Sequence, residues 1–431
     1  MKKLVVAPLA FIAVFFVAFS LQGCLKDSYT STHTYTYYQP VYKTVAEVRA
    51  NIKSNAPKQV ERPGKLYIRG QYIFLNEIDK GIHVIDNSNP DQPRNIAFID
   101  IPGNMDIAVM GNTLYADLYT DFVAIDITNP LQIQLKKVVE GIFPDRYYEF
   151  FRPDSNKILA SWEQRDTTIV NQGELSNWIR QGDVFLSFSA LDNGSGGITR
   201  GGNSGSVASA SPYGMGGSMS RFAITNERLY AVGNQNLDVF NITQPHDPQN
   251  VSRKNIGWNI ETIYPFMNNL FIGSQTGMFI YNISNPDNPV QQGQFNHVRT
   301  CDPVIADNNY AYVTLRSGTT CQGFTNQLDI LNLSNLSNPV LVKTYQLTSP
   351  HGLSKDGNTL FICDGKEGLK IFDASNVSNL QLVKQISGIE NYDVIAWNDN
   401  ALVVAKDGLY QYDYSDLNNI RLRSRIAVSN K

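Results

Sequence analysis

Five acidic or histidine residues recur at equivalent positions of the chain, where they could bind a cation or catalyse hydrolysis. Glu149, Glu261, Asp302, His351 and Asp393 are found by counting nine residues back from the first apolar residue of the second predicted β-strand in each repeated unit. Carboxylates bind hard cations, and two of them about 5–9.5 Å apart, one with a raised pKa, can cleave glycosidic bonds. Aspartate and glutamate also cap turns at strand starts, which is the structural alternative. The choice depends on the elements that position these residues.

The first 24 residues have the pattern of an export signal that ends at a reactive cysteine. Lys2 and Lys3 precede the apolar stretch 4–21, and Gln22-Gly23-Cys24 follows directly. Small residues before a cysteine at the end of an apolar run resemble the lipobox of bacterial lipoproteins. The resemblance implies removal of residues 1–23 and attachment of lipid, including palmitate, at Cys24. An uncleaved membrane anchor is the alternative, because about 18 apolar residues nearly span a bilayer.

The residues after Cys24 bear on the location of the protein. Leu25 stands where aspartate would retain an enterobacterial lipoprotein at the inner membrane, so that resemblance favours the outer membrane. Lys26-Asp27 resembles the short signal that sends Bacteroidetes lipoproteins to the cell surface; a periplasmic orientation is the alternative. Residues 24–63 are expected to hold the lipidated cysteine, a polar tether and a short helix within 45–53.

Composition and motifs exclude several classes of function. The 431 residues carry 36 Lys and Arg against 39 Asp and Glu, which leaves no basic excess for binding nucleic acid. No His-Glu-x-x-His, Gly-x-Ser-x-Gly or phosphate-loop motif occurs. We therefore expect no nucleic-acid partner and no cofactor, with a structural cation such as calcium left open at the acidic positions. Catalytic residues that come from distant parts of the chain would leave no such motif.

A repeated unit of about 40 residues determines the expected fold. Gly81–Pro90 and Gly277–Pro286 share a pattern that ends in Asn/Asp-x-Ser-Asn-Pro, and each unit carries four strand signals separated by turn residues. Four short strands in every 40 to 50 residues predict an all-β chain that forms a β-propeller of four-stranded antiparallel blades over residues 64–431. The Asn-Pro ending is expected to form the turn between the third and fourth strands. Copies of the unit end at positions 90, 130, 245, 286, 336, 377 and 417.

The long interval between two of these copies decides the expected number of blades. Positions 130 and 245 are 115 residues apart, which fits two repeats plus about 35 inserted residues. A degenerate copy at 184–192 lies inside the interval, so eight blades are the favoured expectation, and seven result if that copy forms no sheet. Insertions are expected at about 163–182 and at the Gly-rich stretch 194–217, where long loops would suit recognition.

The repeat resembles the LVIVD repeat, named for the consensus of its third strand. The resemblance is clearest at Gly81–Pro90, Gly277–Pro289 and Gly368–Ser375, and it extends over nearly all of residues 64–425. It implies a β-propeller in a bacterial surface or secreted protein, and it implies no activity.

The antiparallel order of a blade predicts which residues share a face. First-strand starts and the loops between second and third strands lie on one face, so Cys301 and Cys321 of the same blade are expected to form a disulfide in the oxidising envelope. Cys363 lies in an apolar run and is expected to be a buried free thiol. First strands line the central channel, so their starts would ring its mouth. The aligned starts are Gly64, Met105, Glu149, Ser220, Glu261, Asp302, His351 and Asp393.

The sequence therefore favours a non-enzymatic binding or scaffold module, held at the outer membrane by its lipid, that engages an outer-membrane protein or a surface glycan. One alternative is an enzyme acting on a polysaccharide or peptide at the channel mouth through Glu149, Glu261, Asp302 or His351. Another is an accessory subunit of an outer-membrane transport complex. Aromatic residues gathered on one face would favour a glycan, and an apolar patch of several hundred Å² would favour a protein.

Overall fold

The computed structural model describes residues 30–144, 157–172, 215–296, 303–317 and 325–429. Cys24, the expected Cys301–Cys321 disulfide, Glu149, Asp302 and the degenerate copy at 184–192 lie outside these residues. The chain divides into two units, Met1–Tyr42 with Ser161–Leu191, and Lys43–Ala160 with Asp192–Lys431. Within the described ranges, no helix is long and apolar enough to cross a membrane.

The smaller unit contains a two-stranded sheet. β1 (Thr30–Thr44) pairs with β11 (Lys157–Gln172). Thr36 Oγ1 donates to Asp166 Oδ1 over 2.7 Å, and the hydroxyls of Thr34 and Thr168 lie 3.2 Å apart. The stretch expected to be a polar tether therefore includes a strand. The helix expected after it is α2 (Val45–Ala50), which begins at a capping box formed by Thr44 and Glu47.

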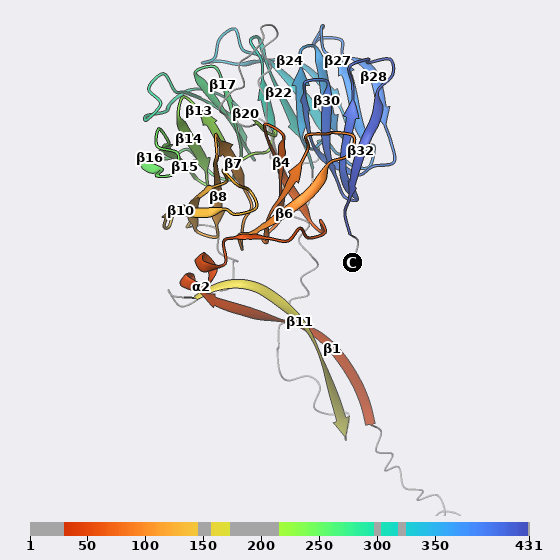
Figure 1. Cartoon of the computed structure of the whole chain (residues 1–431). Coiled ribbons are helices and arrows are strands. Elements are labelled where there is room, and N and C mark those ends of the chain that lie inside the picture. The colour runs from red at the N-terminus through yellow and green to blue at the C-terminus, as the bar shows by residue number, and fades with distance from the viewer. Residues whose placement is uncertain (1–29, 145–156, 173–214, 297–302, 318–324, 430–431) are drawn as a thin grey trace, which may run out of the picture. The chain divides into compact units, whose positions relative to one another are not determined.

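The larger unit is a propeller whose described residues form seven four-stranded antiparallel blades (Figure 1). Blade 1 consists of β3 (Pro63–Arg69), β4 (Tyr72–Glu77), β5 (Gly81–Asp86) and β6 (Arg94–Asp100). Blade 2 consists of β7 (Ile107–Met110), β8 (Thr113–Leu118), β9 (Asp121–Asp126) and β10 (Gln134–Val139). Blade 3 consists of β13 (Phe222–Thr225), β14 (Arg228–Val232), β15 (Asn236–Asn241) and β16 (Gln249–Asn255). Two short strands, β12 (Met215–Gly216) and β2 (Ser54–Asn55), extend blade 1 at its two edges.

The remaining four blades repeat the same order. Blade 4 consists of β17 (Ile260–Phe266), β18 (Asn269–Ser274), β19 (Gly277–Asn282) and β20 (Val290–Asn296). Blade 5 consists of β21 (Val304–Ala306), β22 (Tyr310–Leu315), β23 (Gln327–Asn332) and β24 (Val340–Gln346). Blade 6 consists of β25 (Leu353–Asp356), β26 (Thr359–Cys363), β27 (Leu369–Asp373) and β28 (Gln381–Ile386). Blade 7 consists of β29 (Asn391–Trp397), β30 (Asn400–Ala405), β31 (Gly408–Asp413) and β32 (Arg421–Ala427).

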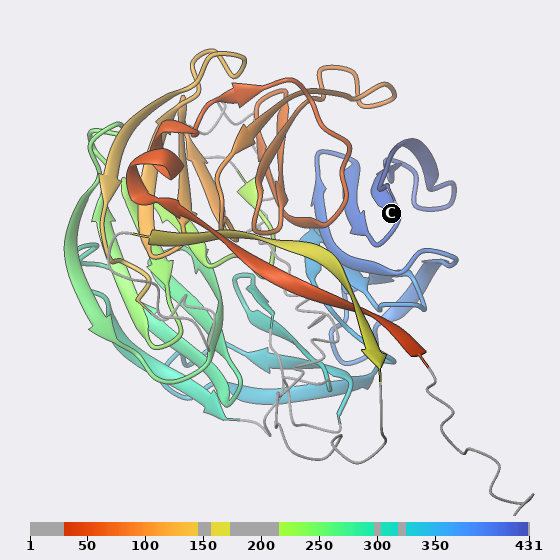
Figure 2. The ribbon, with the colours of Figure 1, turned by 90° about the horizontal axis from the view of Figure 1, so that it is seen from below.

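The blades form a closed ring, with their first strands at the centre (Figure 2). The first strand of each blade contacts the first strand of the next, from β3 through β29, and β3 also contacts β30 of blade 7. Because neighbouring blades cover both faces of each sheet, the first three strands are largely buried, whereas the fourth strands are largely exposed. The core is therefore divided among the interfaces between blades.

Of the two blade numbers that the sequence left open, the described residues form the seven-bladed propeller and not the favoured eight-bladed one. Blade 2 packs directly on blade 3, because β7 contacts β13 and the rings of Phe122 and Phe240 stack with centroids 4.3 Å apart. These two blades flank the 115-residue interval in which an additional blade was expected. Their direct contact leaves no place for another sheet between them.

The repeat motif forms the turn between the third and fourth strands, as the sequence predicts. In blade 1, Asp86 Oδ1 accepts a hydrogen bond from Ser88 N, and Asn89 Oδ1 accepts one from Asp91 N. The glycine that opens the motif is needed for close packing. Gly81 has φ +146°, and a Cβ on it would lie 2.0 Å from Ile99 O of the neighbouring strand.

The motif also joins neighbouring blades through the carbonyl at its proline position. Tyr115 Oη of blade 2 donates to Pro245 O of blade 3, and Tyr230 Oη of blade 3 donates to Pro286 O of blade 4, both over 2.9 Å. Ser424 Oγ of blade 7 donates to Pro90 O of blade 1 over 2.6 Å and so contributes to closing the ring. The recurrence of the motif thus follows from the recurrence of the interface.

Replacing Tyr230 by phenylalanine should lower the free energy of unfolding by about 1 kcal/mol, because it removes the hydrogen bond to Pro286 O without creating a cavity. Urea denaturation of the two proteins checks this value. Tyr281→Phe is the control, since Tyr281 is also buried but makes no side-chain hydrogen bond in the described structure. Equal losses in the two variants would contradict a role for the contact between blades.

Candidate functional site

The starts of the first strands gather at one end of the central channel, which we call the channel mouth. All first strands run in the same direction around the ring, so the residues that precede or begin them share this end. Three of the five sequence-predicted residues lie here among the described ranges. Glu261 is in β17, His351 precedes β25 and Asp393 is in β29. The described residues contain no group of three or more His, Cys, Asp or Glu that could hold a metal ion.

The channel below the mouth is occupied by the chain itself. β12 pairs with β3, with Met215 opposite Ile68 and Gly216 opposite Tyr67. Two residues later, Ser218 Oγ accepts a hydrogen bond from Leu353 N of blade 6 over 2.9 Å. Residues 215–220 therefore lie between blades 1 and 6 on the inner side of the ring. A ligand at the mouth would meet this segment instead of an open passage.

Several buried carboxylates at this end hold the backbone in place. Asp117, in β8, accepts hydrogen bonds from Met105 N over 3.0 Å and from Asp106 N over 2.7 Å. Glu77 in blade 1 and Asp364 in blade 6 accept pairs of backbone amides in the same way. Sequence reasoning missed these residues, although their signal is an acidic residue at or just after the end of a second strand. They carry out the capping role considered for the first-strand acids.

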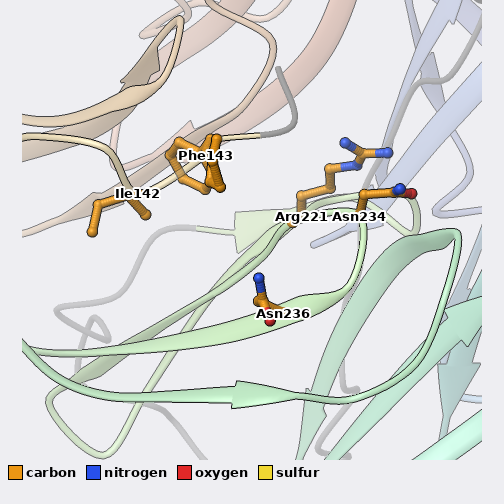
Figure 3. Close-up of a pocket in the computed structure, with 7 residues that line it drawn as sticks. Ile142, Phe143, Arg221, Asn234 and Asn236 are labelled. Carbon is orange, nitrogen blue, oxygen red and sulfur yellow. The ribbon is translucent and has the colours of Figure 1, made fainter. Parts of the chain in front are cut away.

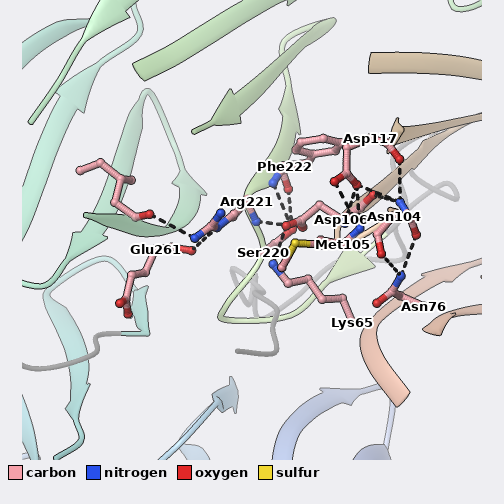
Figure 4. Close-up of polar contacts among 11 residues, drawn as sticks. Lys65, Asn76, Asn104, Met105, Asp106, Asp117, Ser220, Arg221, Phe222 and Glu261 are labelled. Atoms are coloured by element: carbon pink, nitrogen blue, oxygen red, sulfur yellow. Dashed lines mark hydrogen bonds and ion pairs between the residues drawn. The ribbon is translucent and has the colours of Figure 1, made fainter. Parts of the chain in front are cut away.

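A buried ion pair connects blades 1, 2 and 3 (Figure 4). Lys65 Nζ lies 2.5 Å from Asp106 Oδ2, and both side chains are almost fully buried. Arg221 N donates to Asp106 Oδ1 over 3.0 Å. When the repeats within the chain are aligned, Gly64, Met105 and Ser220 take these positions. In each case the charged residue is the next one along the chain. Breaking a buried pair leaves an uncompensated charge, so this pair is structural.

Beyond this pair, Arg221 extends toward blade 4 (Figure 4). Its Nε lies 3.4 Å from Glu261 O and its Nη2 lies 3.5 Å from Ile260 O, so both hydrogen bonds are long. Gln275 Nε2 donates to Glu261 Oε1 over 3.0 Å, and Asn259 Nδ2 donates to Gln275 Oε1 over 3.1 Å. This chain of polar side chains runs along the channel mouth from blade 3 to blade 4.

A pocket of about 180 Å³ lies beside Arg221 (Figure 3). It is smaller than the roughly 300 Å³ of pockets that enclose drug-sized ligands, so it suits one unit or one end of a larger ligand. Trp258, which is 68% exposed, belongs to the turn between β16 and β17 at the same end of the ring. Ile260, two residues after Trp258, donates its amide to Asn234 O over 3.0 Å. The pocket is lined by Ile142, Phe143, Pro144, Arg221, Gly233, Asn234 and Asn236.

His351 and Asp393 lie side by side in blades 6 and 7 and are buried. Gly352 N donates to Tyr392 O, and a Cβ on Gly352 would lie 2.1 Å from Asp393 Oδ1, so glycine leaves room for the carboxylate. The two carboxylate oxygens of Asp393 have no hydrogen-bond partner of normal geometry, and Nδ1 of His351 has none either. Burial lowers the pKa of His351 to about 3, with a smaller contribution from the charge of Arg316. Burial raises the pKa of Asp393 well above its usual value, against the opposing effects of the Val394 amide and Lys65.

Cys363 is a fully buried free thiol, as the sequence predicts. Burial raises the pKa of this thiol, and the nearby carboxylates of Asp393 and Asp364 raise it further. A thiol with a raised pKa forms little thiolate, so Cys363 is a packing residue.

Among the described residues of the channel mouth, the accessible side chains can offer a ligand hydrogen bonds and stacking. Of the residues on which the hydrolytic alternative depends, His351 is only 6% exposed and Glu261 is bonded to Gln275, while Glu149 and Asp302 lie outside the described residues. The accessible groups are instead the guanidinium of Arg221, the amides of Asn234 and Asn259, and the indole of Trp258.

Comparison with known proteins agrees with the repeat read from the sequence. Residues 103–140, 300–347 and 352–387 match the LVIVD repeat. These ranges correspond to blades 2, 5 and 6, so the chain is a β-propeller that carries LVIVD repeats. No curated protein matches the sequence.

Solved structures resemble the chain in fold. The computationally designed Ika8 protein aligns with a TM-score of 0.51 and 9% identity, over 86% of this chain and 90% of that one. A protein from Lactobacillus plantarum has a TM-score of 0.51 and 11% identity, over 85% and 97%. Sqt1 from Saccharomyces cerevisiae has a TM-score of 0.50 and 8% identity, over 87% of each chain. At these identities the likeness shows the fold alone.

Proposed function

We propose that the protein is a binding module that is lipid-anchored at the outer membrane and engages its partner through the channel mouth. The observation that carries this proposal is the pocket beside Arg221, at the end of a rigid ring of blades where Trp258 is also exposed. Rigid scaffolds with recognition residues on their loops are well suited to binding. The occupied channel leaves the partner to be bound at the surface of the mouth.

The anchor rests on the sequence pattern that ends at Cys24. Replacing Cys24 by alanine should abolish incorporation of a palmitate analogue and release the protein from the membrane fraction. Cys363→Ala is the matched control, because Cys363 is buried and should leave labelling unchanged. Labelling that persists in Cys24→Ala would overturn the anchor, and the variant's retention in the membrane without label would indicate an uncleaved signal.

The partner is tested by gentle detergent extraction of the tagged full chain from its native host, followed by mass spectrometry of what co-purifies. A stoichiometric partner should be recovered with the wild type and lost from Arg221→Ala combined with Asn234→Ala. Met267→Ala is the control, because Met267 is 66% exposed in a turn at the opposite end of the ring. A partner that is an outer-membrane transport protein would make the chain an accessory subunit. A partner that is lost only from the control variant would contradict binding at the mouth.

A further inference from the structure

We propose that the rim of blades 3 and 4 binds a carbohydrate, with one sugar ring stacked on Trp258 and its hydroxyl groups bonded by the neighbouring amides and Arg221. This inference rests on the proposed function and names the chemical class of the partner. The rim consists of Arg221, Asn234, Asn236, Trp258, Asn259, Glu261 and Gln275.

Trp258 is exposed on a turn that is fixed at both ends. The flanking residues Ile256 and Ile260 are buried, and their amides donate to Gln235 O and Asn234 O of blade 3 over 2.9 and 3.0 Å. Gln275 N of blade 4 donates to Asn259 O over 3.1 Å. The indole is therefore presented by a turn that is bonded to two blades. A rigid aromatic platform loses little conformational entropy when a ligand binds to it.

The turn adopts a backbone conformation that the fold must support. Gly257 has φ +137° and Asn259 has φ +54°, both in the left-handed region. Asparagine and glycine tolerate this region best, so the sequence Gly-Trp-Asn suits the turn. The conformation leaves the largest apolar side chain of the rim in solvent, where it contributes nothing to the core.

The surroundings of Trp258 match a sugar better than a protein surface. Sugars present C–H groups that stack on an aromatic face, and adjacent hydroxyls that both donate and accept. Amide side chains offer a donor and an acceptor together, and Arg221 offers several donors. Glu261 completes the set with a carboxylate that Gln275 holds in place. Planar polar groups at the same rim as an exposed aromatic ring offer the hydrogen bonds that oriented hydroxyls require.

A protein partner would need a contiguous apolar patch, and the described residues of the mouth do not show one. Among them, Trp258 is the exposed large hydrophobic residue on this face, whereas Leu131 and Met267 lie in turns at the opposite end. The other exposed large hydrophobic residues of the propeller lie on the fourth strands, around the outside of the ring. Protein interfaces bury a larger apolar centre than a single indole.

The pocket limits which part of the glycan binds most deeply. Its volume of about 180 Å³ and its apolar side, formed by Ile142, Phe143 and Pro144, suit one sugar unit or an apolar substituent on that unit. Arg221 and the two asparagines line the opposite side, where hydroxyls would be bonded. The rest of the glycan would extend over Trp258 at the surface.

The test uses the purified full chain in detergent and isothermal titration against soluble cello-, xylo-, manno-, malto- and chito-oligosaccharides, together with polysaccharide extracted from the host cell surface. At least one should bind and shift the tryptophan fluorescence. Trp258→Ala should weaken that binding at least tenfold and Asn234→Ala severalfold, with unchanged thermal unfolding, while Met267→Ala should bind as the wild type does.

Two results would overturn the inference. One is an absence of binding to every probe, and the other is binding that Trp258→Ala leaves unchanged. If all probes fail while the co-purification recovers a protein that the Arg221 and Asn234 double variant loses, the carbohydrate inference fails and the binding module stands. If both experiments fail, the proposed function fails with it.

Discussion

Replacing Phe122 by alanine should lower the free energy of unfolding of the propeller by about 3–5 kcal/mol, the cost expected for deleting a large ring from a packed core. Phe122, in blade 2, is fully buried. Its ring packs against Tyr115 of its own blade, at 5.8 Å between centroids, and against Phe222 and Phe240 of blade 3, at 5.8 and 4.3 Å. The substitution therefore opens a cavity in the interface that determines the number of blades. Chemical denaturation of both proteins gives the loss.

A double-mutant cycle separates this interface from general loss of core volume. Phe122→Leu and Phe240→Leu should be coupled by about 0.5–1.5 kcal/mol, because the two rings stack. The control pair is Phe122→Leu with Phe361→Leu, since Phe361 is also fully buried but packs in the core of blades 6 and 7. Their effects should add. Coupling in the control pair only would contradict direct packing of blade 2 on blade 3.

Replacing His351 by glutamine should make the propeller much less sensitive to acid. The folded pKa of His351 is about 3, below its unfolded value of 6.5. The unfolded chain therefore binds the proton more tightly, and the stability due to the neutral ring is present above pH 6.5 and lost as the pH falls toward 3. At pH 4 this loss should be about 3 kcal/mol. Between pH 7 and pH 4, the measured free energy of unfolding should therefore fall by about 3 kcal/mol less in His351→Gln than in the wild type.

Asp393 has the opposite pH dependence. Its folded pKa is raised, so the stability due to its protonated form is present below about pH 4 and lost as the pH rises toward the folded pKa. In a His351→Gln background, stability should therefore fall as the pH rises above 4. Adding Asp393→Asn should remove this fall, because asparagine does not ionise. An unchanged slope would show that Asp393 has a charged partner in solution.

The repeat made most of the fold predictable from the sequence. The motif begins at Gly81, where two neighbouring strands approach closely, and ends at Pro90, in a turn that side chains cap. Both features depend on local sequence, so both can be recognised without tertiary contacts. The number of blades depends instead on which blades touch. The stacking of Phe122 on Phe240 joins residues 118 positions apart in the sequence, and no local pattern reports such a contact.

The candidate site was less predictable, because the alignment of the repeats selected the residue before the charged one in blades 1, 2 and 3. Met105 and Asp106 are neighbours just before β7, yet the side chain of Met105 is half-buried and that of Asp106 is fully buried. Trp258 belongs to no repeat, and its signal is the sequence Gly-Trp-Asn between two isoleucines. Glu261, His351 and Asp393 were placed at the correct end of the ring, but the burial of His351 and Asp393 depends on packing between blades.

The central claim is that the propeller binds its partner at the channel mouth. Photo-crosslinking in the native host tests this claim most directly. A photoreactive residue would replace Thr276, which is exposed in the loop between β18 and β19 at the mouth. The control position is Ser284, which is exposed in the turn after β19 at the opposite end of the same blade. The account predicts that crosslinking from position 276 gives a covalent adduct of higher mass than the chain alone, and that crosslinking from position 284 gives none. Capture from position 284 with none from position 276 would contradict it.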